Sequence, residues 1–98
     1  MPEANETKSH PLVTVFLPGA LTRLFPGARG TTELHAATVD DMLDALDARW
    51  PGMRDRLADT SPAIRRHINV FVDGERASLD TALDDGAKIY VLTAMSGG

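Results

Sequence analysis

Apolar and polar residues alternate over several short stretches of this chain, and a period of two is typical of half-buried β-strands. The pattern predicts five strands: Leu12–Leu17, Thr31–Ala37, Ile68–Val72, Glu75–Leu79 and an apolar run that begins at Lys88. Asp73-Gly74 is a strong signal for a tight turn. We therefore expect the third and fourth strands to form one hairpin, and the first two to pair antiparallel through their intervening loop.

One stretch between the second and third strands has helical periodicity instead. Its apolar residues recur at spacings of three and four: Val39, Met42, Leu43 and Leu46. Thr38 offers a hydroxyl for an N-cap, acidic residues follow in the first turn, and Pro51-Gly52 is a stop signal. The pattern predicts one amphipathic helix, and the aspartates on its opposite side are interpreted as a solvated face without chemistry.

The remaining segments are predicted as connections and an arm. We expect a loop over Ala20–Gly30, a further helical turn over Met53–Asp59, and a single helical or 3₁₀ turn over Asp80–Gly86. Met1–Pro11 has almost no apolar residue, so it cannot bury enough surface to hold itself in place and is expected to be a flexible arm. The folded domain is predicted to cover residues 12–98.

The order of these elements is strand, strand, helix, strand, short strand, strand. An opening hairpin, one helix and a closing strand imply a mixed sheet with the helix packed on one face. In such a sheet the last strand can lie parallel beside the first. The sequence therefore predicts an α+β fold of the β-grasp, or ubiquitin-like, type.

Composition limits the class of protein. The chain has 98 residues, 43% of them apolar and 24% charged, as expected for one globular domain. The N-terminal residues lack the apolar region of a secretory signal, and the apolar runs are too short to span a membrane. The chain contains no cysteine and hence no thiolate metal site or cysteine nucleophile. We expect a cytoplasmic protein, because this cysteine usage fits a reducing compartment.

Charge limits the class of partner. A net charge of -4 argues against nucleic acid and suits a basic docking surface on another protein. His10, His35 and His67 are scattered without metal-ligand spacing, so no metal site is predicted. Arg65-Arg66-His67 could hold a phosphate or an acidic partner, but the simpler interpretation is a solvated basic segment.

The last apolar run leads directly into Ser96-Gly97-Gly98. Glycine adopts backbone conformations closed to other residues and occupies little width. We expect an exposed Gly-Gly tail that can enter a narrow channel and present its carboxylate to a catalyst on another protein. The alternative is a loose end without function, as is common at termini.

Three segments together resemble the MoaD/ThiS family of sulfur carriers: Ile68-Asn-Val-Phe-Val-Asp-Gly-Glu, Leu79-Asp-Thr-Ala-Leu-Asp-Asp-Gly-Ala-Lys-Ile-Tyr-Val and the terminal Gly97-Gly98. The resemblance covers nearly all of Leu12 to Gly98 and implies the β-grasp fold. It also implies a carrier rather than an enzyme, with no catalytic residue and no bound cofactor of its own. The long spacer Pro51–His67 is most similar to the longer carriers of cysteine or molybdopterin biosynthesis.

The resemblance implies chemistry at the tail. An E1-like enzyme would adenylate the Gly98 carboxylate, using ATP and Mg²⁺, and the product would become a thiocarboxylate. This thiocarboxylate would donate sulfur to an accepting enzyme of molybdopterin, cysteine or thiamine biosynthesis. Ser96 and Met95 would serve as linker and anchor, while Gly97 and Gly98 carry the function.

Strand alternation predicts a docking surface. We expect six strand residues to face the helix: Val13, Val15, Ile68, Val70, Ile89 and Val91. Four large side chains then fall on the other face of the sheet: Phe16, Phe71, Tyr90 and Leu92. Apolar patches of this kind usually mark partner sites, so we interpret this face as the surface that binds the activating or the accepting enzyme. The alternatives are burial under Ala20–Gly30 and burial in a homodimer.

Two other functions are compatible with the same fold. One is a ubiquitin-like modifier that is joined through Gly98 to lysines of other proteins. The other is a non-covalent β-grasp binding module in which the glycines are incidental. The sequence pattern leaves these three functions open.

Overall fold

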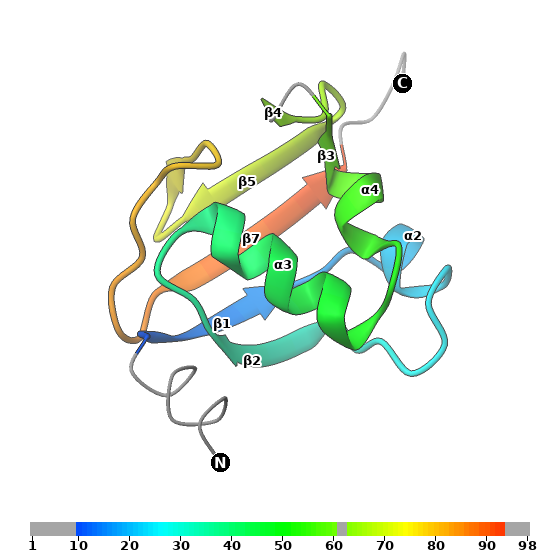
Figure 1. Cartoon of the computed structure of the whole chain (residues 1–98), viewed down its shortest axis with the longest axis horizontal. Helices are drawn as coiled ribbons and strands as arrows, with labels where there is room; N and C mark the ends of the chain where they lie inside the picture. Colours follow the sequence, from blue (N-terminus) through cyan, green and yellow to red (C-terminus); the bar gives the residue numbers. More distant parts are fainter. Residues whose placement is uncertain (1–9, 61–62, 94–98) are drawn as a thin grey trace.

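The computed structural model describes residues 10–60 and 63–93, which form one sheet with a main helix across it (Figure 1). Five strands make the sheet in the order β2-β1-β7-β5-β6. Their bounds are Leu12–Phe16 (β1), Thr31–His35 (β2), Ile68–Val72 (β5), Glu75–Arg76 (β6) and Lys88–Thr93 (β7). β7 pairs parallel with β1 and antiparallel with β5, while β1 pairs antiparallel with β2. The predicted α+β fold with a mixed sheet is confirmed.

The inner face of this sheet forms half of the core. Alternate residues of the three middle strands are buried there: Val13, Val15, Ile68, Val70, Ile89 and Val91. All six are β-branched, and such side chains pack well on a pleated surface because their χ1 angle is already restricted. The predicted inward set of strand residues is therefore the set that the structure buries.

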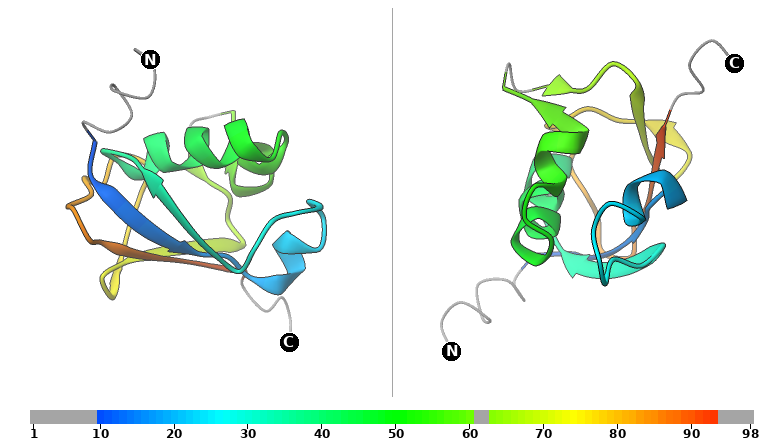
Figure 2. Two further views of the ribbon diagram at one scale, coloured as in Figure 1. Left: turned by 90° about the horizontal axis from the view of Figure 1, so that it is seen from below. Right: turned by 90° about the vertical axis from the view of Figure 1, so that its right-hand side faces the viewer.

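Helix α3, Val39–Arg49, lies across this inner face (Figure 2). It begins after Thr38, whose Oγ1 accepts a hydrogen bond from the backbone N–H of Asp41 at 3.1 Å. Its predicted apolar residues are fully buried: Val39, Met42, Leu43 and Leu46. The helix therefore supplies the other half of the core, as its spacing predicts.

The aspartates of α3 bind the segment that follows the helix. Asp47 Oδ1 accepts the backbone N–H of Gly52 at 2.9 Å and that of Arg54 at 3.1 Å. The Arg54 guanidinium contacts Asp40 at 2.6 Å and Asp44 at 3.1 Å. The hydrogen bond with Asp40 raises the pKa of Arg54. The side chains of Asp40 and Asp44 are 47% and 67% exposed, as expected of a solvated helix face. The prediction did not include the second role of these aspartates, which is to accept hydrogen bonds from the segment that turns back along α3.

Two segments are more regular than the sequence pattern indicates. The expected loop Ala20–Gly30 overlaps a helical turn, which brings Leu21 into the core. After α3 the chain forms a short helix and then a hairpin whose two strands have two residues each. The bounds of these elements are Gly19–Thr22 (α2), Met53–Leu57 (α4), Ala58–Asp59 (β3) and Ala63–Ile64 (β4). The helical turn of α4 is confirmed, while α2 and the hairpin correct the prediction.

The expected helical turn over Asp80–Gly86 is wrong. This segment contains turns and a single bridge between Thr38 and Ala82. Its backbone bonds to distant parts of the chain, since the Leu83 N–H donates to the Ala37 carbonyl at 2.9 Å and the Gly86 N–H donates to the Leu12 carbonyl at 2.8 Å. The N–H groups of Leu83 and Gly86 therefore bond to distant carbonyls and do not form the local hydrogen bonds of a helical turn.

The described chain already contacts the sheet before β1 begins. The Pro11 carbonyl accepts the Ala36 N–H at 3.0 Å, and the His10 carbonyl lies 3.0 Å from the His35 Nδ1. Residues 1–9 of the expected arm lie outside the described residues. In the described part of the chain, no helix has the length and apolar character needed to cross a membrane.

Candidate functional site

The outer face of the sheet brings together the four side chains that alternation predicts there. Strand register places Phe16 beside Tyr90 and Tyr90 beside Phe71, so the three rings form one row across β1, β7 and β5. Leu92 lies two residues further along β7, opposite Asn69. The placement of this predicted surface on one face therefore agrees with the register, and its role in docking stays a prediction.

The row of rings is partly open to solvent. The rings of Phe16 and Tyr90 are stacked, with centroids 4.4 Å apart and an angle of 11° between their planes. Tyr90 and Leu92 remain 42% and 46% exposed, whereas Phe16 and Phe71 are half-buried. A monomer leaves this apolar surface in water, and such exposed patches mark sites where another molecule binds.

A polar pair borders the row on the β6 side. Arg76 lies opposite Phe71, and its guanidinium donates a hydrogen bond to the Asn69 Oδ1 at 2.7 Å. An apolar centre with a polar rim is the usual anatomy of a protein interface. Neither Arg76 nor Asn69 is part of the surface predicted from the sequence. The Asp73-Gly74 turn signal is sufficient to predict the position of Arg76. A two-residue turn sets Val72 opposite Glu75 and therefore Phe71 opposite Arg76.

The segment Ala20–Gly30 does not cover these side chains. Leu21 inserts into the core, and Phe25 lines a hollow together with Trp50 and Pro51. The segment therefore packs beside the end of α3, and no described helix or strand lies over the outer face (Figure 2). Burial under this loop is excluded for Tyr90 and Leu92, while burial in a homodimer stays open.

The tail follows the strand at the centre of the sheet. β7 lies between β1 and β5, and its last residue, Thr93, is paired with Ile68. The predicted site residues Met95, Ser96, Gly97 and Gly98 lie outside the described residues. Thr93 is thus the last described residue before the tail. The prediction for these four residues stays untested.

The charged side chains of the described residues lie away from the outer face or outside any metal-binding arrangement. No group of three or more His, Asp or Glu side chains in residues 10–60 and 63–93 is arranged to hold a metal ion. The ion pairs of Arg54 with Asp40 and Asp44 connect α4 to α3 and do not line the outer face. The outer face is a partly exposed apolar surface on β1, β7 and β5, and β7 is the strand that precedes the tail in the sequence.

A mixed five-stranded sheet with one helix on its inner face and an open, apolar outer face defines a ubiquitin-like β-grasp protein. Comparison with known families gives the particular group. Residues 15–98 match the ThiS family, and the chain belongs to this family. The predicted resemblance is confirmed.

The similar proteins include one named as a sulfur carrier and one named as a small modifier protein. The sulfur carrier protein CysO of Mycobacterium tuberculosis is 32% identical over 92 residues, which cover 88% of this chain and 98% of the relative. The small archaeal modifier protein 3 of Haloferax volcanii is 39% identical over 66 residues, which cover 63% of this chain and 71% of the relative. A chain in the crystal structure of the Amycolatopsis orientalis BexX/CysO complex superposes with a TM-score of 0.78 at 32% identity, covering 88% of this chain and 99% of that one.

Proposed function

We propose that this protein is a sulfur carrier whose Gly98 carboxylate is adenylated by an E1-like enzyme and then converted to a thiocarboxylate. The observation that carries the proposal is the family match, which runs from residue 15 through residue 98 and so includes Gly97 and Gly98. The similarity to CysO, which is named a sulfur carrier protein and is matched over 98% of its length, supports the same role.

The proposed chemistry overcomes the low reactivity of a carboxylate. An ionised carboxylate is a poor electrophile, because it has no adequate leaving group. Attack of a Gly98 carboxylate oxygen on the α-phosphorus of ATP releases pyrophosphate and forms an acyl-adenylate. Hydrosulfide then attacks the acyl carbon and AMP departs, which leaves the thiocarboxylate. Mg²⁺ and ATP belong to the activating enzyme, and this chain acts as a substrate rather than as a catalyst.

The outer face of the sheet is the proposed docking surface for the partner enzymes. The similarity to a chain of the BexX/CysO complex supports an assembly of this kind, since a closely related fold is there found in a complex. The exposed Tyr90 and Leu92 and the half-buried Phe71 supply apolar anchors, as hot spots of interfaces do. The accepting enzyme belongs to molybdopterin, cysteine or thiamine biosynthesis.

Deletion of Gly98 tests the proposal. The variant should lose all adenylation, measured as ATP–pyrophosphate exchange with the E1-like enzyme of the same organism, because the reacting carboxylate is displaced by one residue. Its melting temperature should stay within about 1 °C of wild type, since terminal residues add few contacts. A tag fused after Gly98 should have the same effect, whereas the same tag placed before Met1 is the control. Continued adenylation of the truncated protein would refute the proposal.

A second function is favoured by the similarity to small archaeal modifier protein 3. In that case the activated Gly98 would be transferred to lysine amines of other proteins, forming isopeptide bonds. Immunoblots of cell extracts distinguish the two functions. A ladder of conjugates that disappears when Gly98 is deleted supports the modifier, whereas free protein alone supports the carrier.

A further inference from the structure

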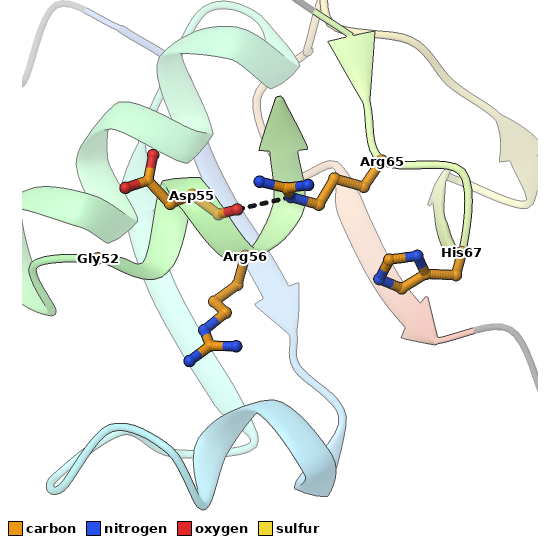
Figure 3. Close-up of a pocket in the computed structure, with 5 residues that line it drawn as sticks. All are labelled: Gly52, Asp55, Arg56, Arg65 and His67. Atoms are coloured by element: carbon orange, nitrogen blue, oxygen red, sulfur yellow. Dashed lines mark hydrogen bonds between the residues drawn. The ribbon is translucent and has the colours of Figure 1, made fainter. Parts of the chain in front are cut away.

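A surface hollow lies beside α4, away from the outer face of the sheet. Its volume is about 620 Å³, and it is lined by Gly52, Asp55, Arg56, Arg65 and His67 (Figure 3). The three basic side chains come from different parts of the chain: Arg56 from α4, Arg65 from the segment after β4, and His67 from the turn before β5. We call this site the basic hollow. The fold brings Arg56 close to Arg65 and His67, which lie about ten residues further along the chain.

The described lining of the basic hollow has more cationic than anionic side chains, since two arginines, Arg56 and Arg65, accompany one aspartate, Asp55. The Arg65 Nε donates a hydrogen bond to the Asp55 backbone carbonyl at 2.6 Å, which fixes the guanidinium without neutralising it. The Asp55 carboxylate points away from Arg65 and His67 (Figure 3). Within the part of the chain that the structure describes, neither Arg56 nor Arg65 forms an ion pair with a carboxylate. The neighbouring Arg54, by contrast, is paired with Asp40 and Asp44.

The basic hollow lies at the end of the sheet where the chain leads to the tail. His67 directly precedes Ile68, which pairs with Thr93, the last described residue of β7. Acidic residues gather where β7 begins, since Asp73 accepts the Lys88 N–H and Asp85 accepts the Leu12 N–H. The two ends of β7 therefore have different charged neighbours: Arg65 and Arg56 near its Thr93 end, and Asp73, Asp85 and Lys88 at its start.

We infer that the basic hollow binds carboxylates of an acidic segment on the protein that receives the C-terminal tail. The inference rests on the proposed function, because a protein that takes up Gly98 must sit at this end of β7. Arg56, Arg65 and His67 would contact the acidic segment, while the outer face supplies the apolar contacts. Complementary charge at this end and repulsion at the acidic end together orient the carrier before the tail enters.

The size of the basic hollow favours a polypeptide segment over a single small anion. Its volume of about 620 Å³ is many times the space that one water molecule requires. Arg56 and His67 lie on different sides of this space (Figure 3). One phosphate would contact only part of the lining, whereas adjacent carboxylates on a chain can contact Arg56, Arg65 and the His67 ring together.

The first test is direct and does not require the activating enzyme. Isotope-labelled protein is titrated with a short polyglutamate peptide, with polyglutamine of the same length and with inorganic phosphate, while amide NMR shifts are recorded. Polyglutamate should shift the amides of Gly52, Arg56 and His67. The effect should fade between about 0.1 M and about 1 M NaCl, where the screening length falls from about 10 Å to about 3 Å. Polyglutamine should have no effect.

Charge reversal supplies the matched variants. Arg56→Glu should abolish the shifts, and Arg65→Glu is a second variant in case the first does not fold. Lys88→Glu reverses the same charge at the far end of β7 and should retain them. Shifts that are equally strong with phosphate would indicate a small-anion site and overturn the inference. Shifts spread over the whole surface, or no shifts with polyglutamate, would also overturn it.

The second test uses the activating enzyme. Arg56→Glu should raise the KM for the carrier in ATP–pyrophosphate exchange by at least about tenfold with little change in kcat, because orientation and not chemistry is impaired. An unchanged KM overturns the inference for this partner. If wild-type protein is not adenylated at all, the proposed function fails, while the polyglutamate titration still decides whether the basic hollow binds carboxylates.

Discussion

The two faces of the central strand differ in what covers them and not in their apolar character. On β7, Ile89 and Val91 point toward α3 and are 0% and 1% exposed. Tyr90 and Leu92 alternate with them and are 42% and 46% exposed. The inner face is covered by a helix with complementary spacing, whereas no described helix or strand covers the outer face. Apolar alternation thus locates both surfaces, and only the arrangement of the other elements shows which one is the core.

The two faces of β7 therefore differ in how much they contribute to folding. Burial of the inner residues stabilises the fold, since each removes apolar surface from water. The exposed outer residues contribute less to folding, and our prediction is that they bind a partner. Substitutions on the two faces should therefore change two different measurements. The predictions below use this expectation.

The largest effect on folding is expected on the inner side. Leu46 of α3 is fully buried, so Leu46→Ala should lower the free energy of unfolding by about 2 to 5 kcal/mol through lost burial and a cavity. Urea denaturation measures the change. The affinity of the remaining folded protein for the E1-like enzyme should stay the same. A denaturation midpoint equal to wild type would contradict the assignment of this face to the core.

The next effect is expected on the outer side and in a different measurement. Leu92→Ala or Phe71→Ala should weaken binding to the purified E1-like enzyme by about 1 to 3 kcal/mol, the usual range for interface anchors. Titration calorimetry measures the affinity, and a thermal melt of the same samples shows whether the fold is retained.

Leu24→Ala is the control for this prediction. Leu24 is 51% exposed but lies in the segment between α2 and β2, away from the sheet face. It should leave both the affinity and the melt unchanged. If Leu92→Ala lowers the melting temperature without changing the affinity, the outer side chains are structural and the docking hypothesis fails.

Much of the fold follows from local pattern. The spacing of Val39, Met42 and Leu46 defines α3, and Thr38 caps it as predicted. The Asp73-Gly74 turn fixes the β5–β6 hairpin, with Asp73 at φ 49° and Gly74 at φ 89°. These features depend on residues close in sequence. A single sequence is therefore sufficient to predict them.

The features missing from the sequence prediction depend on how segments of the chain fold back on one another. Asp47 accepts hydrogen bonds from Gly52 and Arg54, which lie only a few residues further on, because the chain turns back along α3. The segment 80–86 is held by the backbone of Leu12 and Ala37 in place of a local turn. The basic hollow likewise needs α4 and the turn before β5 to meet. None of these contacts has a local signature, because each arises from the way whole elements pack.

The smallest predicted effect refines the contrast between the two faces. Phe16 and Tyr90 are stacked at 4.4 Å on the outer face, so the docking surface also contributes something to folding. A double-mutant cycle with Phe16→Leu and Tyr90→Leu should give a coupling energy of about 0.5 to 1.5 kcal/mol in urea denaturation, the usual value for aromatic pairs. A cycle that pairs Tyr90→Leu with Leu24→Ala is the control and should give none. Zero coupling for the ring pair would mean that the strands alone hold these rings in place, and that the outer face is free to serve binding only.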